Sequence, residues 1–109
     1  MEKGILIGNV YHFAENFPGP GRGPADYIIE TPFTAIPEGR WLAAAHLTNV
    51  TTTIASPARY EVHVVAVALL SDQLPKRRLR ISIACGTDGP NASVDQVLIT
   101  GLVEGRIVG

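Results

Sequence analysis

The sequence predicts an all-β protein: an antiparallel six-stranded β-sandwich or barrel that assembles into an oligomer. Three observations lead to this prediction. Short runs of alternating apolar and polar residues recur between clusters of Gly, Pro, Asn and Asp, and no run has a clear helical period. Charged residues make up 17% of the 109-residue chain, against a usual value of about 25%. For so small a chain, low charge indicates apolar surface that other copies cover.

The stretch Tyr60 to Leu70 is the predicted centre of the fold. Its odd and even positions both become apolar after the first few residues, so a strand here would be covered on both faces. Four valines in one short run after Pro57 favour a strand over a helix, because β-branched side chains suit a pleated surface. We expect a central strand that is covered by the core on one side and by a second sheet or another subunit on the other.

Five further strands and four connecting or terminal segments complete a single domain over residues 1–109. Residues 14–25 contain PGPGRGP and are expected to form a Pro/Gly-rich loop, because this alternation disfavours a helix and a central strand. Polar loops are expected at residues 49–58 and 86–93, and a tail at residues 105–109. The other predicted strands are Gly4 to Phe13, Asp26 to Phe33, Arg40 to Val50, Leu79 to Cys85 and Val94 to Val103.

Charge and cysteine content argue against several classes of function. The net charge is -1, and the only basic cluster is the short run from Lys76 to Arg80, so a dedicated nucleic-acid surface is not expected. The single Cys85 cannot form an internal disulfide, and no zinc-ligand spacing or cofactor motif is present. The N-terminus lacks the features of a signal peptide, and no segment approaches the roughly 20 apolar residues that span a bilayer. We expect a cytoplasmic, soluble protein without membrane contact.

Three histidines are the candidates for catalysis or metal binding. His12, His46 and His63 lie on separate predicted strands, without an HxH or HxxxH spacing. Glu61 is expected to point to the same side as His63. No nucleophile motif is present, and no pattern brings two carboxylates together. This interpretation favours a protein that is not an enzyme and has neither cofactor nor metal, with a small His-dependent enzyme as an alternative.

The order of these features resembles the H-type lectins. Gly4 to Gly8 reads GILIG, an I-x-x-x-F-x-x-x-P pattern follows at Ile29, Phe33 and Pro37, a small-residue strand ends in LTNV, and Arg59 opens the valine-rich strand. The resemblance implies a six-stranded antiparallel sandwich that assembles as a trimer or hexamer and binds galactose-like sugars at subunit boundaries. In that family an Arg at the position of Arg59 contacts the sugar.

The resemblance also implies an altered ligand site. The family's Trp-His pair at the end of the fifth strand has no counterpart in ACGTDG at residues 84–89, and its final-strand Trp corresponds to Gly101. The implied ligand residues are Arg59, Thr87, Asp88 and Asn91, whose polar groups can share hydrogen bonds with hydroxyls. The leading hypothesis is a non-catalytic, multivalent, carbohydrate-binding (lectin-like) module. The alternatives are a structural or assembly component, such as a virion, tail-tip or shell protein, and the small enzyme.

Overall fold

Seven strands and no helix make up the part of the chain that the computed structural model describes, residues 4–33, 41–54, 59–70, 77–88 and 92–105. Within these ranges no helix has the length and hydropathy of a membrane-spanning segment. The strands are β1 (Gly4–Ile7), β2 (Val10–Gly21), β3 (Ala25–Glu30), β4 (Leu42–Ile54), β5 (Arg59–Leu70), β6 (Arg78–Asp88) and β7 (Ala92–Glu104).

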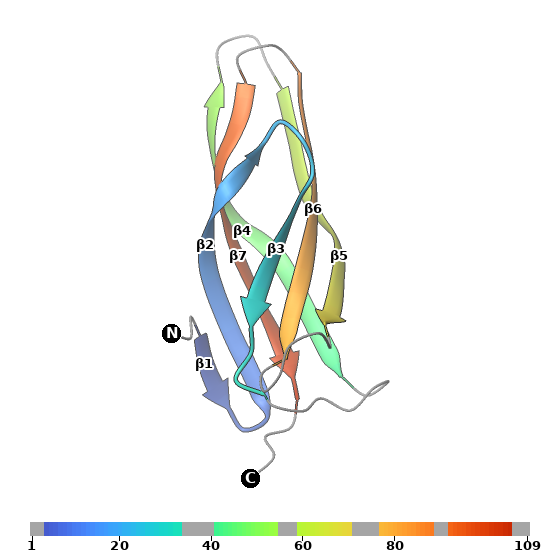
Figure 1. Cartoon of the computed structure of the whole chain (residues 1–109). Coiled ribbons are helices and arrows are strands. Elements are labelled where there is room, and N and C mark those ends of the chain that lie inside the picture. The colour runs from blue at the N-terminus through green and yellow to red at the C-terminus, as the bar shows by residue number, and fades with distance from the viewer. Residues whose placement is uncertain (1–3, 34–40, 55–58, 71–76, 89–91, 106–109) are drawn as a thin grey trace.

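The strands form two antiparallel sheets that face each other (Figure 1). Sheet A has the order β1-β2-β7-β4 and sheet B the order β3-β6-β5. The chain passes from sheet A to sheet B through the short turn between β2 and β3. The predicted all-β antiparallel sandwich is confirmed, as two sheets and not one closed barrel. The described residues contain seven strands where six were expected. Assembly into an oligomer remains a prediction.

The core lies between the sheets and is built from alternate residues of nearly every strand. Leu79, Ile81 and Ile83 of β6 are buried, and Cys85 packs partly buried against the same core. Alternation of this kind is what an antiparallel sheet with one covered face produces. The buried cluster consists of Tyr11, Phe13, Ile29, Phe33, Leu79, Ile81, Ile83, Val94, Val97, Ile99 and Val103.

The seventh strand arises because residues 4–13 form a hairpin and not one strand. Ile7 pairs with Val10, which leaves Gly8 and Asn9 as a two-residue loop. Gly8 has a φ of 63°, and Asn9 does not share this left-handed conformation. A positive φ at the first central position alone is the pattern of a type II′ turn. The sequence contains a signal for it, since Gly-Asn between two apolar runs is typical of such a hairpin.

The Pro/Gly-rich loop predicted at residues 14–25 is wrong for residues 14–21, which belong to β2, and for Ala25, which begins β3. β2 pairs with β7 as far as Pro18, and the register shifts between Pro18 and Gly21. Among the described residues β1 pairs only with residues 10–13 of β2, so the prolines lie where one side of β2 has no neighbouring strand. Proline is tolerated at such edges and bulges, because no ladder hydrogen bond is lost.

Side chains of sheet B hold this irregular end of β2 in place. The Tyr27 hydroxyl donates a hydrogen bond of 2.7 Å to the Pro18 carbonyl oxygen. The Tyr27 ring also packs on the Phe17 ring, with 4.8 Å between centroids. The Cys85 thiol donates to the Gly21 carbonyl oxygen at 3.8 Å. These long-range contacts offset the poor strand propensity of the Pro/Gly alternation.

The valine-rich strand β5 is extended as predicted, but it lies at the edge of sheet B and not at its centre. Val62, Val64, Val67 and Leu69 pack against the core, whereas Val65 is 56% exposed. The inward positions change from even to odd because the register shifts between residues 64 and 66. A bulge inserts one extra residue. The core-facing apolar residues therefore occupy even positions before the bulge and odd positions after it, and in the sequence this looks like a strand with two apolar faces. Coverage of the outer face by another subunit remains a prediction.

The strands also extend into residues that were expected to form loops. β4 continues to Ile54, so residues 49–54 of the predicted 49–58 loop are strand, and residues 55–58 lie outside the described ranges. β6 ends at Asp88 and β7 begins at Ala92, so the loop predicted at residues 86–93 is wrong for residues 86–88, 92 and 93. Residues 89–91 lie outside the described ranges. Of the predicted tail, Gly105 donates its N–H to the Asn9 carbonyl oxygen at 2.9 Å. Pairing between long neighbouring strands outweighs the local turn preference of Gly, Asn and Thr.

Candidate functional site

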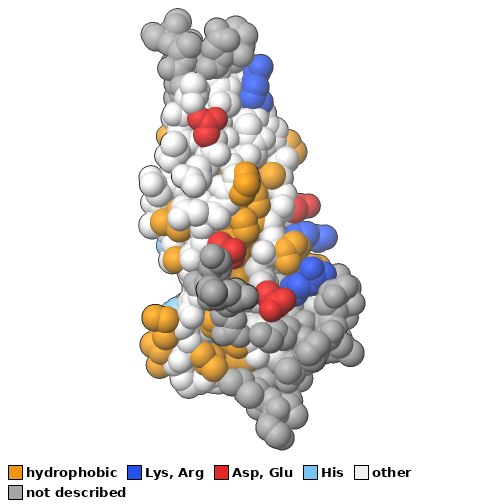
Figure 2. Space-filling model, turned by 60° about the vertical axis from the view of Figure 1, so that its left-hand side comes forward, with side chains coloured by type: hydrophobic (Ala, Val, Ile, Leu, Met, Phe, Trp, Pro, Cys, Tyr) orange, Lys and Arg blue, Asp and Glu red, His pale blue; other side chains and the backbone are white. Residues whose placement is uncertain are grey.

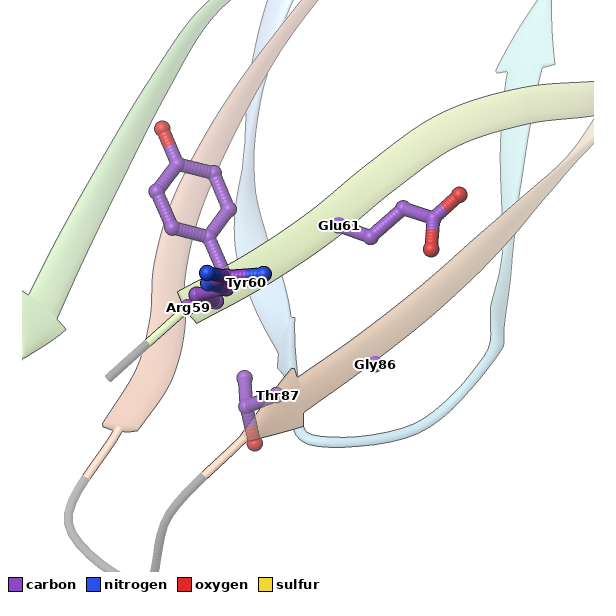
Figure 3. Close-up of a pocket in the computed structure, with 5 residues that line it drawn as sticks. All are labelled: Arg59, Tyr60, Glu61, Gly86 and Thr87. Carbon is purple, nitrogen blue, oxygen red and sulfur yellow. The ribbon is translucent and has the colours of Figure 1, made fainter.

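A depression of about 460 Å³ lies where β5 begins and β6 ends. Five residues line it: Arg59, Tyr60, Glu61, Gly86 and Thr87 (Figure 3). All five come from two neighbouring strands of sheet B. The site therefore belongs to the open end of the sandwich.

The register of β5 and β6 explains which residues meet here. Arg59 lies opposite Asp88, Tyr60 opposite Thr87, and Glu61 opposite Gly86. Three of the four predicted ligand residues, Arg59, Thr87 and Asp88, are thus brought to one place. Asn91 and the side chain of Asp88 lie outside what the structure describes. Ligand binding by these residues remains a prediction.

The two sides of sheet B contribute different groups to the depression. Residues directly opposite each other share a face, so Tyr60 and Thr87 lie on the core side of the sheet, as Val62 does. Glu61 and Gly86 lie on the outer side, and Figure 3 shows Tyr60 and Glu61 leaving β5 in different directions. Tyr60 is 44% exposed, so part of its ring is available for contact.

Gly86 leaves space on the outer side of the depression. A Cβ added at this position would have no atom within 4 Å. Its backbone is not in the left-handed region, which among the described glycines only Gly8 and Gly21 adopt. A larger residue at this position is therefore free of backbone strain and would occupy the depression.

Arg22 is a neighbour of the site that the sequence interpretation missed. Its Nε–H donates a hydrogen bond of 3.0 Å to the Thr87 hydroxyl oxygen, across 65 residues of sequence. No local pattern could have indicated this contact. Tyr60, by contrast, could have been added to the predicted site as the neighbour of Arg59 on the same strand.

Two of the three histidines lie beside one groove, and the third does not. His46 and His63 line a depression of about 340 Å³ between the edge strands β4 and β5. His12 lies on β2 opposite Leu102, on the exposed face of sheet A. The described residues contain no group of three or more side chains suited to hold a metal ion. The geometry gives no support to an enzyme that uses all three histidines.

Glu61 and His63 point to the same side of β5, as expected. His63 Nδ1 lies 3.9 Å from Glu61 Oε1, and both side chains are exposed. This separation is too long for a hydrogen bond. The pair therefore lacks the close contact that orients a general base.

Three other groups have shifted pKa values, all away from the depression's lining. Burial raises the pKa of the Tyr27 phenol, and the nearby Cys85 adds to the rise. Burial also raises the pKa of the Cys85 thiol, which disfavours the reactive thiolate. Hydrogen bonds from the Thr53 and Ser93 hydroxyls lower the pKa of the exposed Asp95 carboxyl. None of these shifts creates a nucleophile or a general base near neutral pH.

Comparisons with family models, curated proteins and solved structures gave no match. The likeness to the H-type lectins therefore still depends on the sequence features given above.

Proposed function

We propose that this chain is a non-catalytic binding module that recognises a glycan at the end of sheet B formed by β5 and β6. One observation carries the proposal. The register places Arg59, Tyr60 and Thr87 around one depression, although Arg59 and Thr87 are 28 residues apart in the sequence. Arg59 and Thr87 are two of the ligand residues that the lectin resemblance implies.

The lining residues suit a polyhydroxylated ligand. The Arg59 guanidinium is a fork of N–H donors, the Glu61 carboxylate accepts hydrogen bonds, and the Thr87 hydroxyl does both. The exposed part of the Tyr60 ring offers a flat apolar surface for the apolar face of a sugar ring. Arg59 and Glu61 carry opposite formal charges, so the lining favours a neutral ligand over an ion.

Binding is favoured over catalysis because the described lining lacks a catalytic pair. Glycoside hydrolysis usually requires two carboxyl groups on either side of the scissile bond. Among the described side chains around the depression, Glu61 is the single carboxylate. The hydroxyl of Thr87 accepts a hydrogen bond from a guanidinium, which is not a base that could activate it.

Multivalency is part of this proposal. A site built from five residues on one sheet end offers few contacts to a sugar, so affinity per site is weak. A homo-oligomer, a trimer or hexamer as the lectin resemblance implies, would present several copies of the site to a surface with many glycans. Linked sites can raise overall binding by about 10²- to 10⁴-fold without any new contact.

A glycan array probed with the full chain tests the proposal. Arg59→Ala should abolish the array signal, and Gly86→Val should do so by filling the depression. Arg80→Ala is the matched control, because Arg80 is an exposed Arg of β6 that does not line the depression. Absence of binding to any glycan at millimolar sugar, or equal binding by wild type and Arg59→Ala, would overturn the proposal.

A structural or assembly component is a second candidate, supported by the shape and surface of the molecule. The chain extends 54 × 21 × 19 Å, an elongated form that suits side-by-side packing of copies. Ile5, Ile7 and Leu42 are large, exposed apolar residues. Assembly of the purified chain together with a blank glycan array would favour this function over the first.

A further inference from the structure

The outer faces of the two sheets differ in charge. The four strands of sheet A contain no Lys or Arg. Those of sheet B carry seven charged residues, namely Asp26, Glu30, Arg59, Glu61, Arg78, Arg80 and Asp88. In Figure 2 the Lys and Arg side chains gather toward the right-hand side, while hydrophobic side chains are exposed in the lower part of the molecule. The strands of sheet B thus carry more than twice as many charged residues as those of sheet A, which contain Glu15, Asp95 and Glu104.

The apolar residues of sheet A lie next to one another at one end of the sheet. The registers define two rows across it. Ile7, Val10, Glu104 and Leu42 form the end row, and Ile5, His12, Leu102 and Ala44 form the next. We call the six apolar members the sheet A patch: Ile5, Ile7, Val10, Leu42, Ala44 and Leu102.

Four of the six residues of the sheet A patch, Ile5, Ile7, Leu42 and Ala44, are exposed in the single chain, and Val10 and Leu102 are half-buried. Ile5 is 68% exposed, Ile7 64% and Leu42 58%. The six residues of the patch come from four strands, β1, β2, β4 and β7, so their meeting is a property of the fold and not of a local apolar run. Exposed apolar residues that lie together, unlike scattered ones, mark a surface that associates.

We propose that sheet A docks face to face on sheet A of a second copy of this chain. A two-fold contact places the same surface on both sides, so that surface must not carry a group of like charges that would repel when two copies meet. A face without Lys or Arg meets this requirement. Among the residues of these strands, the one carboxylate beside the patch is that of Glu104, which lies between Val10 and Leu42 in the end row and accepts a hydrogen bond from Asn9 at 3.4 Å.

The chemistry of the face also argues against other occupants. Nucleic acids and acidic partners are bound through Lys and Arg, which sheet A lacks. A basic partner would need a group of carboxylates, and these four strands contain only Glu15, Asp95 and Glu104. Aliphatic side chains on a pleated surface are instead what two sheets use when they pack about 10 Å apart.

The size of the face matches a stable contact. β7 has 13 residues, which at about 3.3 Å per residue span about 43 Å, and four strands about 4.8 Å apart are about 19 Å wide. Because β1 is short, the face offers about 600 to 800 Å², close to the roughly 800 Å² that each partner buries in a standard interface. The sheet A patch occupies one end of this face, and mainly uncharged polar residues cover the rest.

This inference names the surface for the homo-oligomer proposed above, and it is independent of sugar binding. A two-fold contact alone gives a dimer, and with a three-fold contact elsewhere it gives a hexamer. In both cases the number of copies is even. Of the trimer and the hexamer named above, only the hexamer is compatible with this contact.

Light scattering during size-exclusion chromatography of the full chain tests the inference. We expect a mass that is an even multiple of 11.6 kDa. Ile7→Lys/Leu42→Lys should halve that mass, because it places four like charges in the two-fold contact. The control Ile28→Lys/Val65→Lys makes the same kind of change on sheet B, at residues that are 39% and 56% exposed, and should leave the mass unchanged.

Folding is checked by far-UV circular dichroism. Both altered side chains in the sheet A variant are largely exposed, so its β spectrum should be retained. If it is not, Ile7→Ser/Leu42→Ser replaces it and should also halve the mass. A monomeric or odd-numbered wild type, a folded sheet A variant with the wild-type mass, or a halved mass in the sheet B control would overturn the inference. A blank glycan array with an even-numbered mass would remove only the sugar proposal.

Discussion

Alanine at Gly101 and alanine at Gly86 should change stability in opposite directions, although both glycines lie within strands. At Gly101 an added Cβ would collide with the Ala44 carbonyl oxygen and would lie 2.8 Å from Cζ of Phe13 and 2.9 Å from the Cα of Ala45. Favourable contacts between carbon atoms are about 3.5 to 4.0 Å long. The main chain of the β2-β7-β4 ladder would have to shift, and such overpacking costs about 1 to 3 kcal/mol.

At Gly86 the same methyl group would meet no atom within 4 Å. Replacing Gly by Ala where the backbone is compatible stabilises a protein by about 0.4 to 1 kcal/mol, because the unfolded chain loses freedom. The same entropic gain applies at Gly101 and offsets part of its cost. We therefore expect Gly86→Ala to unfold at a higher urea concentration than wild type, and Gly101→Ala at a lower one.

Urea unfolding at one fixed protein concentration measures both effects, since self-association makes stability depend on concentration. The free energies of unfolding of the two variants should differ by about 1 to 3 kcal/mol. That difference corresponds to roughly 4 to 8 °C in Tm per kcal/mol for a domain near this size. If Gly101→Ala is as stable as Gly86→Ala, the close approach of β7 to β4 is wrong, and with it the register of sheet A.

Three smaller predictions concern the groups with shifted pKa values. Tyr27→Phe should lower the free energy of unfolding by about 0.5 to 1.5 kcal/mol through loss of the hydrogen bond to Pro18. Wild type should also lose stability as pH rises through the raised pKa of Tyr27, and the variant should lose less, because only the Cys85 thiol with its raised pKa remains of the two. Hydrogen bonds lower the pKa of Asp95, so its carboxylate stabilises the folded chain at pH values above about 3.9, the pKa in the unfolded chain, and this stabilisation is lost as pH falls. Thr53→Val removes one of these hydrogen bonds, so the Tm of this variant should fall less in acid than that of wild type. Cys85 should react with a thiol reagent more slowly in the folded chain than in denaturant, and equal rates would show that its thiol is not shielded.

Regular alternation made much of the fold predictable from sequence. Leu79, Ile81 and Ile83 alternate with polar residues, and a half-covered antiparallel strand requires that pattern. The two-residue hairpin at Gly8 was missed, because residues 4–13 were predicted as one strand, although its Gly-Asn turn is visible in the sequence. In both cases the determining interactions are local, so the sequence pattern reports them directly.

The other errors fall where distant residues decide the local structure. Pro18 and its neighbours look like a loop because their backbone preferences are poor for a strand, but β7 pairs with them and Tyr27 bonds to them from the other sheet. The valine-rich strand looked covered on both faces because the extra residue near Val65 shifts the alternation by one position. A bulge has no clear sequence signal when every residue around it is apolar.

At the candidate site, individual residues were predicted from the sequence, but their arrangement in space was not. Arg59 was singled out from the lectin resemblance, and so were Thr87 and Asp88, but their meeting depends on the register of β5 and β6. Register is fixed by the whole set of cross-strand pairs, and a single sequence does not reveal it. The contact from Arg22 to Thr87 is even harder to predict from sequence, since it connects the turn after β2 to the end of β6.

The two proposed surfaces lie on different sheets, and this decides whether they can work together. Pairing through sheet A covers Ile7, Leu42 and their neighbours, while the depression at Arg59 belongs to sheet B. Face-to-face packing of sheet A therefore leaves each depression open to solvent and turns the two copies of sheet B away from each other. A ligand carried on a large surface would then engage one side of a dimer at a time. Avidity on a single surface would require a further contact that places several depressions on the same side, as the three-fold contact of a hexamer does.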